Sequence, residues 1–305
     1  MPQLMKITSR PFGPRQFAKE CRRPSVPGKS KSGAWRPNSQ RGVDVLTMNN
    51  AAPIGDNAEM IPRFHVPFLL APGATVDLPA EAAHHALKVL RVGAGDTAVL
   101  FDGRGGEWLA TLQPAGKGLR AVLREYFDIN REPSLQVNLV QCLAAADKMD
   151  FVVQKSTELG VSRIQPVAAK RSVIRLSGER MERRVAHWTN IVSAACEQSG
   201  RNRVPEVAPI VDLAQYFAAA TAHNDFRLIC LAPSADVPCV QLRDLPRPVH
   251  PVTLLIGPEG GFEETEIKAA LFAGFRTLNL GPRVLRTETA GPAALAAMMS
   301  PRGDL

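Results

Sequence analysis

The sequence is poor in aromatic residues, in paired cysteines and in long apolar runs, and each shortage excludes a class of protein. Aromatic side chains make up 6% of the chain, too few for a broad platform that stacks single-stranded nucleic acid. The five cysteines are odd in number and form no Cys-X-X-Cys pair, so neither a disulfide framework nor a zinc site is indicated. No apolar run is long enough to span a bilayer. We therefore expect free thiols, no metal ion, no membrane association and a cytoplasmic location.

Length and charge point to two globular domains and a basic N-terminal segment. With 305 residues, of which 45% are hydrophobic and 22% charged, the chain can form two cores of ordinary size. Ten basic and four acidic residues among the first 60 account for +6 of the formal net charge of +8. The remainder is nearly balanced, so any surface there that binds nucleic acid must arise from local clustering of basic side chains.

Short β-type runs separated by turns predict a small β-barrel-like domain over residues 61–130. Val99–Phe101 and Glu107–Leu112 flank a glycine-rich stretch and indicate a hairpin. Ala82–Leu90 has the pattern of a short helix. The polar, proline-containing stretch Asp128–Ser134 is the predicted linker to the next domain.

Residues 135–305 alternate apolar strands with helices, which predicts a parallel α/β sheet covered on both faces. The expected strands include Leu135–Ala144, Ile164–Val167, Phe226–Leu231 and Val252–Ile256, and the expected helices include Met149–Leu159, Glu179–Gln198, Asp212–Ala220 and Glu263–Ala273. Because proline fits the first turn of a helix, where its missing N–H is not needed, the last helix should begin near Gly291-Pro292 and run through Met299.

Two glycine-containing loops, Leu254–Phe262 and Leu278–Ala290, each follow a short apolar run and indicate a ligand site. Loops at the same ends of adjacent parallel strands form a crevice, and glycine lets the backbone approach a ligand closely. The first loop lacks the Gly-Lys-Ser/Thr ending of a phosphate-binding loop, and Glu259 would repel a polyphosphate. A neutral or cationic ligand suits it better. For one loop alone an ordinary strand-to-helix turn is the favoured interpretation, whereas the two loops together, with charged residues in the second, favour a site.

Several motifs together resemble the bacterial 16S ribosomal RNA uracil-N3 methyltransferases, members of the trefoil-knotted SPOUT superfamily. They are Asp147–Met149, Gln154–Gly160, Ala195–Arg203, Ile256–Gly261 and Leu280–Thr289. The resemblance runs from about Ile61 to the C-terminus. It implies a PUA-like domain that grips RNA, followed by a knotted parallel-sheet methyltransferase domain, and a homodimer. Periodicity alone would not predict a knot.

The resemblance also implies the cofactor, the substrate and the site. S-adenosylmethionine would lie in the knot loops, and the acceptor would be N3 of a specific uridine in the decoding region of 16S rRNA, within the small ribosomal subunit. The implied cofactor-binding residues are Leu231, Ile256, Gly257, Pro258, Glu259, Gly260, Gly261, Leu280, Gly281, Arg283, Val284, Leu285 and Thr287.

Three charged residues are the candidates for catalysis: Arg286, Glu288 and Glu197. A carboxylate could take the proton of uracil N3, and a guanidinium could stabilise charge on the flanking carbonyl oxygens. We place Arg286 first, as a residue that orients the substrate, and single out no base. Structural roles are open for the acids, since Glu288 could simply favour a helix N-terminus and Glu197 could be an ion-pair partner.

Candidate RNA contacts are basic side chains in both domains: His84, Lys88, Arg91, Lys148, Lys155, Arg171, Arg201 and Arg203. A solvated helix face explains the first three equally well. Arg201 and Arg203 could instead bind the C-terminal carbonyl groups of the helix before them.

Residues 1–60 show no periodicity and are rich in proline, glycine, serine and arginine, so we expect them to be disordered. They are either a basic arm that touches nucleic acid or a dispensable extension, and we favour the second. Two other functions stay open for the whole chain. One is a knotted RNA methyltransferase with another acceptor, and the other is a non-catalytic RNA-binding factor of ribosome assembly.

Overall fold

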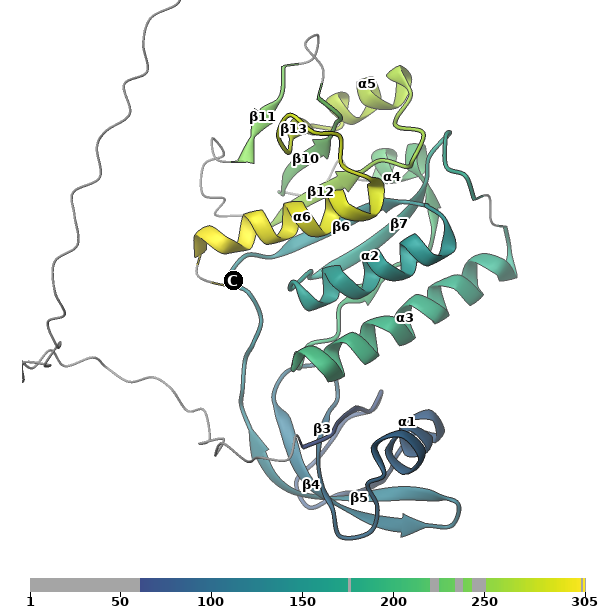
Figure 1. The fold of residues 1–305 in the computed structure, drawn as a ribbon, viewed down its shortest axis with the longest axis vertical. Coiled ribbons are helices and arrows are strands. Elements are labelled where there is room, and N and C mark those ends of the chain that lie inside the picture. The colour runs from purple at the N-terminus through teal and green to yellow at the C-terminus, as the bar shows by residue number, and fades with distance from the viewer. Residues whose placement is uncertain are drawn as a thin grey trace, which may run out of the picture. The chain divides into compact units, whose positions relative to one another are not determined.

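The computed structural model describes residues 61–174, 177–219, 225–233, 238–242, 251–302 and 304 (Figure 1). The predicted extension, residues 1–60, lies outside them. Across these described segments, no helix is both long and apolar enough to cross a membrane. The same segments contain no group of three or more His, Cys, Asp or Glu side chains that could hold a metal ion.

The first part of the described chain forms a five-stranded sheet with the order β1-β3-β4-β5-β2. Its strands are β1 (Arg63–His65), β2 (Thr75–Asp77), β3 (Thr97–Phe101), β4 (Glu107–Ala115) and β5 (Gly118–Phe127). The predicted hairpin is confirmed, because β3 and β4 pair antiparallel. Phe64, Leu100 and Leu112 are fully buried between this sheet and the helix that follows β2.

That helix begins as α1 (Ala80–His84) and continues as a wider π-helical turn over His85–Leu90. It ends at Arg91, whose φ of 58° is left-handed, and the amide of Val92 bonds the carbonyl of Ala86 at 3.0 Å. The expected helix Ala82–Leu90 is therefore present and starts two residues earlier. Its exposed side carries His84, Lys88 and Arg91.

The second part forms an eight-stranded sheet in which each pair of neighbouring strands runs parallel, with the order β11-β13-β10-β12-β6-β7-β8 and β9 beside β7. The strands are β6 (Val137–Cys142), β7 (Arg163–Ala168), β8 (Glu206–Val207), β9 (Val211–Asp212), β10 (Phe226–Cys230), β11 (Val240–Gln241), β12 (Val252–Ile256) and β13 (Arg276–Asn279). The helices are α2 (Ala146–Glu158), α3 (Glu179–Ser199), α4 (Leu213–Ala219), α5 (Glu264–Phe272) and α6 (Thr287–Met299).

Helices cover both faces of this sheet, as the apolar strands predicted (Figure 1). Leu139 and Leu254 pack under α2, α3 and α6, whereas their neighbours Val140 and Leu255 pack under α4 and α5. All five residues of β12 are buried. Successive side chains of a strand point to opposite faces, so a strand covered on both sides must be apolar throughout.

The predicted start of the last helix was wrong. α6 begins at Thr287, and Gly291-Pro292 lies inside it. Proline there removes one backbone hydrogen bond, but packing compensates, since Ala290, Ala294 and Leu295 are buried. Gly291 lies against the sheet, and a Cβ added to it would be 3.5 Å from Leu139 and 3.7 Å from Ile256. Close helix-to-sheet packing thus overrides the local preference of the Gly-Pro pair.

A polar junction joins the small sheet to the end of α3. Arg63 Nη1 and Arg131 Nη1 lie 2.6 and 2.9 Å from the same oxygen of Glu107, which is 6% exposed. Both arginines also donate to the carbonyl of Gly200, and Arg63 donates to Asn202 Oδ1 at 2.6 Å. The junction therefore satisfies the carbonyl of Gly200, which follows the last residue of α3, with cationic donors from β1 and from the linker.

Candidate active site

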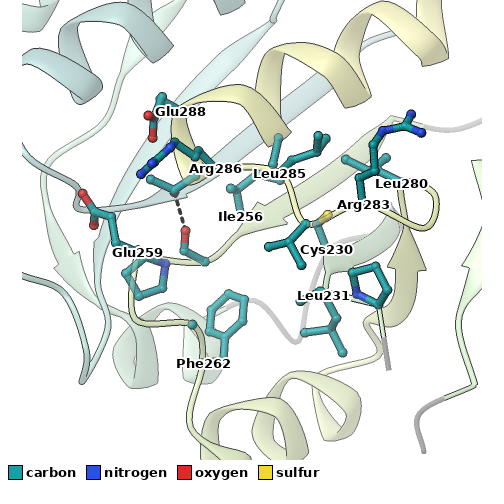
Figure 2. Close-up of a pocket in the computed structure, with 18 of the residues that line it drawn as sticks. Cys230, Leu231, Ile256, Glu259, Phe262, Leu280, Arg283, Leu285, Arg286 and Glu288 are labelled. Atoms are coloured by element: carbon teal, nitrogen blue, oxygen red, sulfur yellow. Dashed lines mark hydrogen bonds between the residues drawn. The ribbon is translucent and has the colours of Figure 1, made fainter. Parts of the chain in front are cut away.

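A cavity of about 660 Å³ opens at the carboxyl ends of β10, β12 and β13 (Figure 2). Its walls are the segment that follows β10, the loop between β12 and α5, and the loop between β13 and α6. Crevices at this edge of a parallel sheet are common ligand sites, and the volume suits a small molecule.

Most of the predicted cofactor residues line this cavity: Leu231, Ile256, Gly257, Pro258, Glu259, Gly261, Leu280, Arg283, Val284, Leu285 and Thr287. Two do not. Gly260 lies against Arg171, which donates to its carbonyl at 3.3 Å, and Gly281 bonds Asn279 Oδ1 through its amide. The lining also includes Cys230, Phe262 and Ile267, which the sequence pattern did not single out.

The position of Gly257 in the loop leaves no room for a side chain. A Cβ added to it would lie 2.9 Å from the ring of Phe262, closer than real side chains tolerate. Its carbonyl accepts the hydroxyl of Thr287, and Thr287 Oγ1 in turn accepts Gln141 Nε2 at 3.1 Å. Gln141 and Thr287 are both buried. This buried chain of hydrogen bonds fixes the first turn of α6 to the loop after β12.

Charged side chains gather on one side of the cavity. Figure 2 shows Glu259, Arg286 and Glu288 there, whereas Arg283 lies on the opposite side with its guanidinium directed away. Lys148, from the first turn of α2, lies 3.3 Å from Glu259 Oε1 and 3.7 Å from Glu288 Oε2. Arg286 occupies the N-cap position of α6 and is exposed.

The two carboxylates differ in their bonding. Burial raises the pKa of Glu259, but hydrogen bonds from the amide of Ala145 at 3.1 Å and from Lys148 outweigh it, so the pKa lies below its usual value. Glu288 Oε2 is shielded from solvent and has no hydrogen-bond partner among the described residues. Glu259 thus accepts two hydrogen bonds, whereas Glu288 Oε2 accepts none from the described residues.

The third catalytic candidate, Glu197, lies outside this cavity. Its Oε1 accepts the amide of His65 at 2.8 Å, and burial is the main cause that raises its pKa. It belongs to the junction with the small sheet, since the C-terminal end of α3 packs on β1.

Arg201 is also part of the packed structure and not of the surface. It is 4% exposed, forms an ion pair with Glu132 and donates to the carbonyl of Thr157 at 2.8 Å. These contacts correct its prediction as an RNA contact, because a buried guanidinium with three acceptors has no room for a phosphate. Arg203 is exposed and forms a backbone bridge with Arg104 of the β3–β4 hairpin.

The remaining basic candidates fall into two groups. His84 and Lys88 line a second cavity of about 770 Å³ on the small domain, together with Lys117 and Arg120, while Arg91 is exposed nearby in the chain. Lys155 pairs with Glu158 at 2.8 Å, and Arg171 lies beside the loop after β12. Lys148 lines the main cavity.

Comparison with known proteins gives the family. Residues 130–299 match the model of an RNA methyltransferase domain, and residues 78–119 match that of an RNA methyltransferase PUA domain. These matches and the solved structures below confirm the expected fold class, a SPOUT methyltransferase domain preceded by a PUA-like domain.

Three individual proteins illustrate the similarity. Ribosomal RNA small subunit methyltransferase E from Buchnera aphidicola is 32% identical over 80% of this chain and 98% of its own length. The enzyme of the same name from Neisseria gonorrhoeae, solved bound to S-adenosyl methionine, is 40% identical, with a TM-score of 0.71 over 79% of this chain and 98% of that one. The protein Lpg2936 from Legionella pneumophila, solved with bound S-adenosylmethionine, is 35% identical, with a TM-score of 0.74 over 80% of this chain and 98% of that one. The chain thus belongs to the ribosomal RNA small subunit methyltransferase E family.

Proposed function

We propose that this protein uses S-adenosylmethionine to methylate N3 of one specific uridine in the decoding region of 16S rRNA. The observation that carries the proposal is the cavity at the strand ends, which combines an apolar, glycine-containing wall with Arg286 and Glu288 at its rim. Membership of the family supports an rRNA substrate in the small ribosomal subunit.

The residues of the cavity fit this cofactor. Leu231, Leu280 and Leu285 offer an apolar wall for an adenine ring, and Gly257 and Gly261 bring backbone without side chains to the lining. Glu259 and Glu288 add negative charge, which suits the cationic sulfonium and amino groups of the ligand. When bound, S-adenosylmethionine supplies the methyl group, and its S–CH₃ bond breaks with the electron pair passing to sulfur.

The side chains at the rim would act on the acceptor base. Arg286 would bind the uracil carbonyl oxygens that flank N3 and stabilise the charge that develops on them. The N3 proton must leave before or during attack, and a carboxylate of the cavity would accept it. Because N3 lies on the pairing edge, the uridine must be unpaired when it enters the site. The expected homodimer stays a prediction, which light scattering of the purified protein would check.

Replacing Thr287 by valine should weaken cofactor binding by about tenfold. The substitution keeps the shape of the side chain but leaves the carbonyl of Gly257 without its buried donor, at a cost of about 1–3 kcal/mol. Calorimetric titration of S-adenosylmethionine into the purified variant measures the loss. A Thr287→Ser variant keeps the hydroxyl and should bind within about threefold of the wild type. Equal affinities for all three proteins would exclude this role.

The cavity of the small domain should bind the RNA backbone. Lys88 and Lys117 line it beside His84, and removing one phosphate-binding cation from such a site weakens binding uniformly and lowers the salt slope by about one. We expect a Lys88→Ala variant to bind RNA about threefold to tenfold more weakly at low salt. Fluorescence anisotropy over a salt series checks this, with the exposed Lys268 on α5 replaced by alanine as the matched control. An unchanged slope would place the RNA elsewhere.

Primer extension on rRNA tests the proposed reaction. A methyl group on N3 removes the pairing donor of uracil, so reverse transcriptase should stop at a single position of 16S rRNA treated with enzyme and cofactor. Small subunits from a strain without the enzyme provide the substrate. Methyl transfer without a stop would indicate an acceptor off the pairing edge, such as a ribose hydroxyl. No transfer to subunits, ribosomes or naked RNA would favour a binding factor.

A further inference from the structure

The ammonium group of Lys148 is paired with carboxylates of the protein itself. Its ammonium lies between Glu259 and Glu288, which come from the two loops that form the cavity. The three side chains are 25%, 22% and 20% exposed, so solvent screens their charges only in part. The charge of a lysine that is shared between two largely buried carboxylates is already neutralised, so it would contribute little to binding an RNA phosphate.

The two carboxylates are held to different degrees. Glu259 Oε1 accepts both the Ala145 amide, at the N-terminus of α2, and Lys148. Glu288 Oε2 has Lys148 as its only ion-pair partner in the described part of the chain and accepts no hydrogen bond there. Because this oxygen is shielded from solvent, the charge of Lys148 at 3.7 Å is what holds the Glu288 carboxylate in place among the described residues.

We propose that the carboxylate of Glu288, which lines the cavity, accepts the N3 proton of the substrate, and that Lys148 is the positioning residue that holds this carboxylate through Oε2. The inference rests on the proposed function. In this step the N3–H bond breaks and the proton bonds to the Glu288 carboxylate, while the electron pair left on nitrogen forms the new N–C bond and the pair of the broken S–CH₃ bond passes to sulfur. The proton later leaves to solvent. Glu259 anchors Lys148 and takes no proton.

A double-mutant cycle separates this role from an RNA contact. If Lys148 acts through Glu288, a Lys148→Met variant should lose about tenfold in kcat with an unchanged KM for RNA. A Glu288→Gln variant should lose about a hundredfold or more. Adding Lys148→Met to Glu288→Gln should cause no further loss, because the group it positions is already gone. Lys148→Arg should restore most of the activity.

Direct binding supplies the readout that does not depend on turnover. RNA affinity and its salt slope, measured without cofactor, should be the same for Lys148→Met and the wild type. Lys268→Met, which removes a lysine from the exposed pair with Glu264, is the matched control for both assays. Thermal unfolding shows whether each variant is folded, and Lys148→Gln, which also removes the charge, serves if Lys148→Met is not.

Three results would overturn the inference: losses that multiply in the double variant, a lower salt slope for Lys148→Met, or a Glu259→Gln variant that is more impaired than Glu288→Gln. Failure of the proposed function looks different. If the wild type methylates another position of the RNA, the uridine assignment falls, whereas the coupling of Lys148 to Glu288 is still measured by the same cycle.

Discussion

An Arg286→Ala variant should lose about a hundredfold to a thousandfold in kcat while binding S-adenosylmethionine within about threefold of the wild type. Arg286 occupies the N-cap position of α6 and lies on the same side of the cavity as Glu288 (Figure 2). Its guanidinium would meet charge that builds up on the uracil carbonyl oxygens only as the proton leaves, so its loss should appear in the chemical step. Single-turnover methyl transfer and calorimetry measure the two quantities.

Two further variants sharpen this prediction. Arg286→Lys keeps the charge but loses the planar pair of donors, so it should recover only part of the rate. Arg183→Ala removes an exposed arginine from α3, whose partner Glu179 is one helical turn away, and should leave the rate unchanged. A kcat for Arg286→Ala within about twofold of the wild type would show that the substrate is oriented by other groups.

A Glu107→Ala variant should unfold about 2–4 kcal/mol more easily than the wild type. Removing this acid leaves Arg63, with a side chain 14% exposed, and Arg131 without their shared carboxylate at the junction. The penalty of an unpaired buried charge is the main cost, reduced here because Arg131 is 40% exposed. Urea denaturation measures the difference, and a change below about 0.5 kcal/mol would mean that the junction is energetically neutral.

The same acid predicts a pH dependence. Burial raises the pKa of Glu107, but the hydrogen bonds and charges of Arg131 and Arg63 outweigh it, so the pKa lies below its usual value of 4.5. A lowered pKa in the folded state means that the stabilisation is complete above the unfolded value and declines as the pH falls through the folded one. The advantage of the wild type over Glu107→Gln should thus be constant above about pH 5.5 and shrink below pH 4.5. A gap that widens on acidification would contradict this sign.

The local pattern of apolar residues predicted most of the α/β sheet, because strands buried on both faces must be apolar throughout. Val252–Ile256 is uninterrupted and apolar, as a central strand covered on both faces requires, and it is β12 in the structure. Gly160, with a φ of 86°, follows the last turn of α2 where the sequence placed a stop. The start of α6 was missed because its first turn is stabilised by Gln141, far away in the sequence, and not by a local signal.

The roles of single charged residues were the hardest to predict. Arg201 lies 69 residues from its partner Glu132, and Lys148 lies 111 residues from Glu259. From the sequence, Lys148 and Arg201 were both predicted to be exposed basic side chains that bind RNA. Only the packing of α2 and α3 against distant loops shows that their charges are already paired. Glu197 likewise lies outside the cavity, because its carboxylate is bonded to the amide of His65, 132 residues away in the sequence.

Identification of the methylated nucleoside tests the central claim most directly. Small subunits from a strain without the enzyme are incubated with the protein and isotopically labelled S-adenosylmethionine, and the rRNA is digested and separated against standards. We predict that all label migrates with 3-methyluridine and that one 16S fragment contains it. Label in 5-methyluridine, in a 2′-O-methylated nucleoside or in another base would contradict the proposed acceptor.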